Sequence, residues 1–201
     1  EQLTGLKGVW NATEGVFKVT QPRNDLPVNV DGWTMPPFMG LTSWAAFKVG
    51  LKSEAMVMGD LVLFQDEVNP VMSAALDAGL SVTALHNHFF YDEPHVYFMH
   101  IGGEGTVEML GSAVHAVLSE VKEIRTANPT PAKLFGAGFA PKTNAITGKV
   151  IDDVLGTKGQ DKDGMFKVVI GRTANMAGGC EVGKEMGVNT WAAFAGTDDN
   201  A

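Results

Sequence analysis

Four of the five histidines in this chain lie within fifteen positions, from residue 86 to residue 100. His86 and His88 are two residues apart in the run 82–88, which reads as a strand, so both side chains are expected on one face. Neutral imidazole nitrogens that converge in this way bind zinc, copper, iron or nickel. The spacing therefore predicts a metal site with His86 and His88 as two of its ligands.

The run 95–101 reads as the next strand, antiparallel to the first, and it carries His95 and His100. Same-face positions on paired strands lie within a few ångströms of each other. We favour His100 as the third ligand, because it sits beside two glycines where we expect the strand to end. His95 and Glu93 are kept as additional ligand candidates. Zinc is the ion expected first, since it accepts three histidines plus water or a carboxylate, and copper is the alternative.

Two glutamates are candidate catalytic residues. Glu104 follows the glycines and is expected to act as a ligand, as a base or as a residue stabilised at a helix N-terminus. Glu67 is a weaker candidate. A metal with an open position lowers the pKa of bound water to about 7, and a nearby glutamate can then act as the base. Two alternatives stay open: a hydrogen-bonded histidine cluster without metal, and an anion site formed by the backbone of 102–105.

The strands and helices that position these residues can be predicted from local sequence patterns. Alternating side chains predict a strand at 55–64, with Met56, Met58, Asp60 and Val62 on one face. Pro70 and Gly79 suit the two ends of a helix at 69–79. Further strands are expected at 15–20, 28–30, 43–49, 82–88 and 95–101, with a loop at 89–94 and a long helix from the glycines to about residue 125. This ββαββα order predicts an α+β fold, with an antiparallel or mixed sheet and helices packed on it.

The chain contains an internal repeat. Gly15-Val16-Phe17-Lys18-Val19 recurs 149 residues later as Gly164-Met165-Phe166-Lys167-Val168, and Trp44-Ala45-Ala46-Phe47 recurs 147 residues later as Trp191-Ala192-Ala193-Phe194. Two matches in one order at nearly one offset predict a tandem duplication of domain size. The second copy stops before the counterpart of the histidine segment. We expect a first repeat at 1–127, a linker at 128–141 and a partial second repeat at 142–201.

Composition limits the classes of partner. The net charge is −8 and the pI about 5.0, so the basic footprint of a nucleic-acid binder is missing. The sequence shows no apolar run of the roughly 18 residues that a transmembrane helix needs. Cys180 is the only cysteine, so no intrachain disulfide forms. The first residue is Glu1 rather than methionine, which fits a signal peptide that has been removed.

Several runs together resemble the LppY/LpqO family, a bacterial domain of unknown function that is mostly exported and often built as two tandem copies. The runs are Met58–Leu63, Asp66–Met72, Val82–His88 and Phe98–Gly103, with Pro22–Leu26 and Val30–Gly32 upstream. The resemblance covers essentially the whole chain. It implies a periplasmic or secreted location, a second His-Asn-His motif in the missing part of the second copy, and a preference for His86, His88 and His100 over His95. It implies no activity.

Three hypotheses about function follow. The first is an exported protein that binds a metal ion, or a small polar ligand, through the histidine cluster. The second is a metal-dependent hydrolase or lyase. The third is a non-catalytic envelope binding module that uses the aromatic residues Trp10, Trp33 and Tyr97. Because an incomplete second copy leaves strand edges unpaired, we also expect self-association or pairing with the missing second-repeat fragment.

Overall fold

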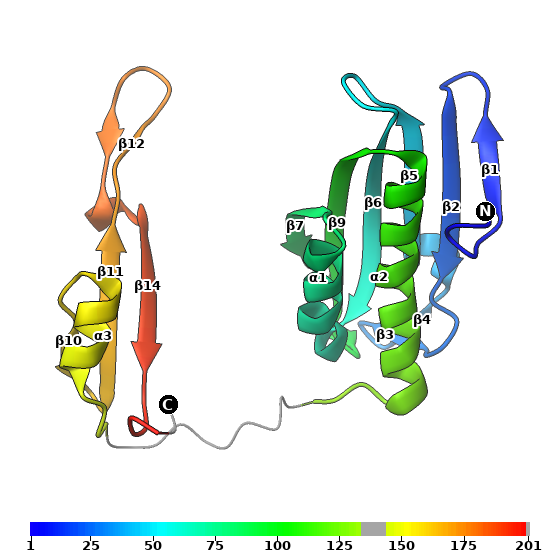
Figure 1. The fold of residues 1–201 in the computed structure, drawn as a ribbon. Helices are drawn as coiled ribbons and strands as arrows, with labels where there is room; N and C mark the ends of the chain where they lie inside the picture. Colours follow the sequence, from blue (N-terminus) through cyan, green and yellow to red (C-terminus); the bar gives the residue numbers. More distant parts are fainter. Residues whose placement is uncertain (134–143, 200–201) are drawn as a thin grey trace. The chain divides into compact units, whose positions relative to one another are not determined.

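The computed structural model describes residues 1–133 and 144–199. The chain forms two compact units, residues 1–135 and 136–201, and each is described by itself. The described residues form an α+β fold of mostly antiparallel sheets with three α-helices, so the α+β class predicted from the sequence is confirmed (Figure 1). None of the helices in those residues is long and apolar enough to cross a membrane.

The first unit is built on a six-stranded antiparallel sheet in the order β1-β2-β5-β6-β9-β7. Helix α1 leads from β6 to β7 by way of a short 3-10 turn (η2), and β9 then returns between them. Figure 1 shows this arrangement. The elements are β1 (Gly8–Asn11), β2 (Val16–Pro22), β5 (Thr42–Val49), β6 (Ala55–Phe64), η2 (Gln65–Glu67), α1 (Val68–Asp77), β7 (Ser81–His86) and β9 (Val96–Gly105).

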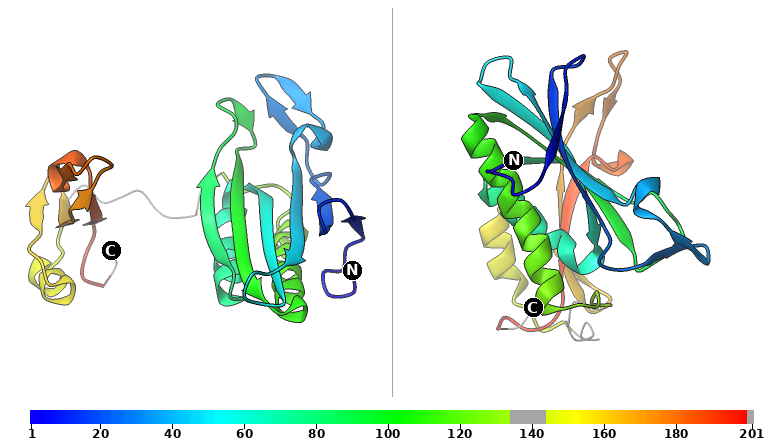
Figure 2. Two further views of the ribbon diagram at one scale, coloured as in Figure 1. Left: turned by 90° about the horizontal axis from the view of Figure 1, so that it is seen from above. Right: turned by 90° about the vertical axis from the view of Figure 1, so that its right-hand side faces the viewer.

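Helices α1 and α2 (Val107–Ala127) cover one face of this sheet (Figure 2). Helix α2 begins at the N-cap Thr106, whose side chain accepts a hydrogen bond from the Met109 N–H at 3.1 Å. Its buried residues recur every three or four positions, as an amphipathic helix requires. They pack on the apolar side chains that β6 and β9 point to that face, and together these residues form the main core.

A small three-stranded sheet lies against the other face, as Figure 2 shows. It consists of β3 (Val28–Val30), β4 (Trp33–Met35) and β8 (Asp92–Glu93), and a 3-10 turn, η1 (Pro37–Met39), follows β4. Its residues form a second core with Val62, Phe64 and Phe98 of the large sheet. Asp60 and His100 lie two residues further along the same strands, outside this second core. The helix-free face is therefore covered at one end and open beside Asp60 and His100.

The second unit contains α3 (Gly148–Leu155) and a sheet in the order β10-β11-β14. The strands are β10 (Gln160–Lys162), β11 (Met165–Gly171) and β14 (Asn189–Phe194), with a hairpin of β12 (Ala174–Asn175) and β13 (Glu181–Val182) and a 3-10 turn, η3 (Lys184–Met186). Lys167 pairs with Ala193, just as Lys18 pairs with Ala46 in the first unit. Lys167 also lies over the Trp191 ring at 4.7 Å, and Lys18 over Trp44 at 4.3 Å. The order of elements and the strand register therefore match.

The structure corrects three predictions about the elements near the histidines. The run 102–105 continues β9 instead of turning into a helix, and α2 begins at Val107. Strand β7 ends at His86, so His88 lies beyond it. The predicted loop at 89–94 contains β8. A packing requirement explains the glycine at 103, because a Cβ there would lie 3.1 Å from Leu80 and 3.3 Å from Leu110.

The linker was predicted at 128–141. Helix α2 ends at Ala127, with Asn128 as its C-cap. Residues 134–141 of the predicted linker lie outside the described residues.

Candidate functional site

Three neighbouring strands bring Asp60, His86 and His100 together. Asp60 on β6 is the direct partner of His100 on β9, and His100 is in turn the partner of Ala84 on β7. His86 follows two residues after Ala84, so the side chains of Asp60, His86 and His100 share the helix-free face. The register of the sheet therefore brings His100 together with residues that lie 40 and 14 positions away from it in the chain.

The polar atoms of the three residues are close. The Nε2 atoms of His86 and His100 lie 3.1 Å apart. The Asp60 Oδ2 atom lies 3.7 Å from the same Nε2 of His100. The His100 side chain is 43% exposed and that of Asp60 is 18% exposed, so the group is open to solvent on the histidine side. We call Asp60, His86 and His100 the strand cluster.

His88 occupies a different position from the one its spacing predicts. Its ring stacks on the buried ring of Phe98, with centroids 3.8 Å apart and planes 14° apart. It also stacks on His86 at 5.0 Å, whereas His86 meets His100 edge-on at 80°. The His88 ring thus stacks on both His86 and Phe98.

Asp60 is a member of the site that sequence reasoning missed. Burial raises the pKa of Asp60 above its ordinary value, and His100, His88 and His86 act in the opposite direction. Its Oδ1 atom is buried and has no hydrogen-bond partner among the described residues. A charged residue on the same face as Met56, Met58 and Val62 was visible in the sequence. That signal placed Asp60 on this face, but the pairing with His100 needed the strand register.

The contact between the two histidines can be satisfied in two ways. One ring can donate an N–H to the lone pair of the other, or both lone pairs can point at a cation between the rings. Within residues 1–133 and 144–199, no group of three or more His, Cys, Asp or Glu side chains has the geometry of a metal site. The arrangement is therefore a histidine pair with one adjacent carboxylate, open on one side.

The additional ligand candidates lie elsewhere. His95 Nδ1 is 3.1 Å from the carboxylate of Asp92, and the His95 side chain is 54% exposed. Asp92 also accepts a hydrogen bond from the Val96 N–H at 2.6 Å. Glu93 is exposed and lies 3.5 Å from Lys133. His95 and Glu93 thus belong to the region around β8, outside the strand cluster.

Neither candidate glutamate is near the strand cluster. Glu104 shares the face of His100 but lies four residues along β9, which is about 13 Å. Its carboxylate accepts a hydrogen bond from Ser53 at 3.2 Å, and it lies within β9 rather than at the start of a helix. Glu67 is fully buried, where it accepts hydrogen bonds from Arg23 and from the Phe64 N–H and forms an ion pair with Arg125. Glu67 therefore has a structural environment.

The aromatic residues of the binding-module hypothesis do not form one exposed surface. Trp10 and Trp33 are exposed, on β1 and β4. Tyr97 packs against the main core under the helices. A surface built from all three rings is therefore not present in the first unit.

Comparison with known proteins gives one positive finding. The model of a family described as a Domain of Unknown Function (DUF1259) matches residues 1–120 and 149–201. No curated protein and no solved structure matches the chain. The matched ranges include the strand cluster and the matching strands of the second unit.

Proposed function

The chain belongs to this family of domains of unknown function, and from the geometry of the strand cluster we propose that its first unit binds a divalent metal ion. The ligands are the Nε2 atoms of His86 and His100 and the carboxylate of Asp60. Zinc is the ion of choice, since it binds histidine nitrogen and carboxylate oxygen and keeps a fourth position for water or a ligand. Copper is the alternative.

One observation carries this proposal, namely the 3.1 Å separation of the two Nε2 atoms beside the carboxylate of Asp60. Two ligand nitrogens bound to one ion at about 2.0–2.1 Å lie at a comparable distance from each other. A cation there would also give a partner to the buried Oδ1 of Asp60. His88 is assigned a supporting role, because it lies beyond the end of β7 and its ring stacks on Phe98 and His86.

The proposal is tested by titrating zinc into the metal-free chain by calorimetry and by measuring metal content after dialysis. We expect one zinc per chain. His86→Ala and His100→Ala should each weaken binding by 100-fold or more, and His95→Ala, at an exposed position between β8 and β9, is the matched control. Sub-stoichiometric metal that does not change in His86→Ala would contradict the proposal. Circular dichroism of each variant separates loss of binding from loss of fold.

A hydrolase or lyase built on this site would need a base other than the two glutamates predicted for that role. Glu104 lies about 13 Å along the strand from His100, and Glu67 is held between two arginines. We therefore propose metal binding without assigning a catalytic residue.

We also propose that residues 8–49 and 160–194 are two copies of one structural unit. The shared sequence runs, the matching register and the family match in both parts of the chain support this. The exported location implied by the resemblance to the LppY/LpqO family is likewise a proposal. Cell fractionation of a bacterium that produces the natural protein tests it, and recovery with cytoplasmic markers would refute it.

A further inference from the structure

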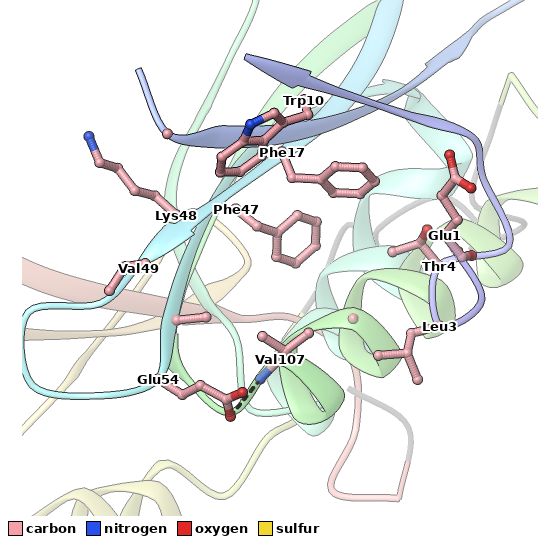
Figure 3. A pocket seen from close by; sticks show the side chains of 13 residues that line it. Glu1, Leu3, Thr4, Trp10, Phe17, Phe47, Lys48, Val49, Glu54 and Val107 are labelled. Atoms are coloured by element: carbon pink, nitrogen blue, oxygen red, sulfur yellow. Dashed lines mark hydrogen bonds between the residues drawn. The ribbon is translucent and has the colours of Figure 1, made fainter. Parts of the chain in front are cut away.

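The first unit contains an apolar cavity on the helix side of its sheet, away from the strand cluster. It has a volume of about 360 Å³ and lies between strands β1, β2 and β5 and the first turn of α2. Figure 3 shows Phe17 and Phe47 directed into it, with Trp10 above them and Val107 opposite. The volume is in the range of ligand pockets, so this part of the sheet has room for an occupant.

Two carboxylates at the rim are already engaged. Glu54 accepts a hydrogen bond from the Val107 N–H at 3.3 Å, which Figure 3 marks with a dashed line. Glu1 accepts one from the Gly8 N–H at 2.9 Å. The interior of the cavity is lined by aromatic and aliphatic side chains. Its chemistry therefore suits an apolar surface better than a polar small molecule.

The second unit shows what covers the equivalent position. Phe166 pairs with Phe194 as Phe17 pairs with Phe47. Phe166 is only 6% exposed, because the start of α3 lies against its ring: a Cβ on Gly148 would be 2.3 Å from it. In the second unit a short helix thus occupies the place of the cavity.

The turn that leads into the first strand is also the same in both units. Gly156, the C-cap of α3, has φ 66°, and Gly5 has φ 69°. In each unit a glycine three residues later, Gly8 or Gly159, lies against the phenylalanine ring. The Gly5 N–H donates to the Glu1 carbonyl at 2.9 Å, a helical four-residue hydrogen bond. Residues 1–5 therefore have the form of a last helical turn and stand where α3 ends in the second unit.

We propose that the cavity is the receptor for a short amphipathic helix that is continuous with Glu1 and runs into the turn at Gly5, as α3 runs into Gly156. Its apolar face packs on Phe17, Phe47 and Val107, and its polar face is turned to solvent. This is a helix-in-groove contact. Such a helix is too short to be stable alone, so the cavity supplies most of its stabilisation.

The test adds the five residues Thr-Gly-Lys-Val-Ile, the sequence of 147–151, directly before Glu1 of the full chain. The register places the added isoleucine where Ile151 stands in α3. We expect the midpoint of thermal unfolding of the first unit to rise by about 3 °C or more. The matched control carries Thr-Gly-Lys-Ser-Ser and should leave the midpoint unchanged.

Protection from hydrogen exchange is the second readout. The apolar extension should slow exchange of its own amides and of the first turn of α2, while the serine extension should not. Equal midpoints for both extensions, or no added protection, would overturn the proposal. Saturable binding of decanoate that the apolar extension leaves unchanged would assign the cavity to a small apolar ligand, and dimerisation through this face would assign it to a second copy. Either outcome also contradicts the proposal.

Discussion

The Nε2 atoms of His86 and His100 lie 3.1 Å apart on neighbouring antiparallel strands. Their rings meet edge-on at 80°, and Asp60 sits on the next strand, 3.7 Å from His100. The open side of this group faces away from the helices. The strand cluster therefore lies on the opposite face of the sheet from α1 and α2.

The first prediction asks whether His88 orients His86 or binds the metal itself. Because its ring is stacked on Phe98 and His86, His88→Ala should weaken zinc binding by about 10-fold, less than His86→Ala does, through lost orientation of His86. The measurement is calorimetric titration next to His86→Ala. A loss in His88→Ala as large as that in His86→Ala would show that His88 is itself a ligand, as its spacing first predicted.

The ionised Asp60 carboxylate should lower the free energy of unfolding when no metal is bound. Burial raises its pKa, so the folded chain holds this proton to higher pH than the unfolded chain does. The stabilisation linked to the proton is then present at low pH and is lost as the pH rises through the folded-state pKa. Asp60→Asn should raise the free energy of unfolding of the metal-free chain at pH 7.5, by up to about 1 kcal/mol.

Urea unfolding in the presence of a chelator measures this effect. The gain in Asp60→Asn should shrink as the pH is lowered, and the same substitution should weaken zinc binding. Asp31→Asn, at an exposed turn position that asparagine also adopts, is the control and should change neither quantity. A destabilised Asp60→Asn chain at pH 7.5 would contradict this account of the carboxylate.

Glu67 should contribute to the stability of the fold and not to zinc affinity. Its carboxylate is fully buried between Arg23 and Arg125, so Glu67→Ala leaves two buried guanidinium groups without this partner. We expect a loss of about 3–5 kcal/mol in the free energy of unfolding. Glu93→Ala, which removes an exposed ion pair with Lys133, should cost less than about 1 kcal/mol.

The two measurements to compare are urea unfolding and zinc affinity at low temperature, where the Glu67→Ala chain remains folded. A Glu67→Ala chain of normal stability that has lost zinc would return Glu67 to the site and refute the structural assignment.

Two adjacent glycines on β9, Gly102 and Gly103, allow a controlled test of how tightly this strand is packed. A Cβ at Gly103 would press on Leu80 and Leu110, whereas a Cβ at Gly102 meets its nearest atom at 3.7 Å. Gly103→Ala should therefore destabilise the chain by about 1–3 kcal/mol through overpacking. Gly102→Ala should be nearly neutral. Equal effects in thermal unfolding would show that Leu80 and Leu110 do not restrict the space at position 103.

Local patterns in the sequence predicted part of the fold. The alternation in 55–64 predicted β6 with its observed bounds, and 28–30 likewise became β3. The glycines at 102–105 led to the wrong prediction that the strand ends there. A glycine required by close packing cannot be distinguished from a glycine required by a turn in a single sequence. The end of β7 at His86 is set by pairing with Phe98, which no local pattern reveals.

The candidate site was predictable to a similar extent. The histidine spacing located the face and two members of the strand cluster, His86 and His100. Asp60 was recognised only as sharing a face with apolar residues, because its partnership with His100 depends on the register of strands that are far apart in the chain. Glu67 was a candidate catalytic residue in the sequence, and only the fold shows that it forms ion pairs with two buried arginines, Arg23 and Arg125.

The central claim is that the strand cluster binds a metal, and a crystal structure of the zinc-soaked chain with anomalous data tests it most directly. We predict one anomalous peak in the first unit, about 2.0–2.2 Å from the Nε2 atoms of His86 and His100 and from a carboxylate oxygen of Asp60. A peak at other residues, or no peak and an intact 3.1 Å contact between the two histidines, would contradict the claim.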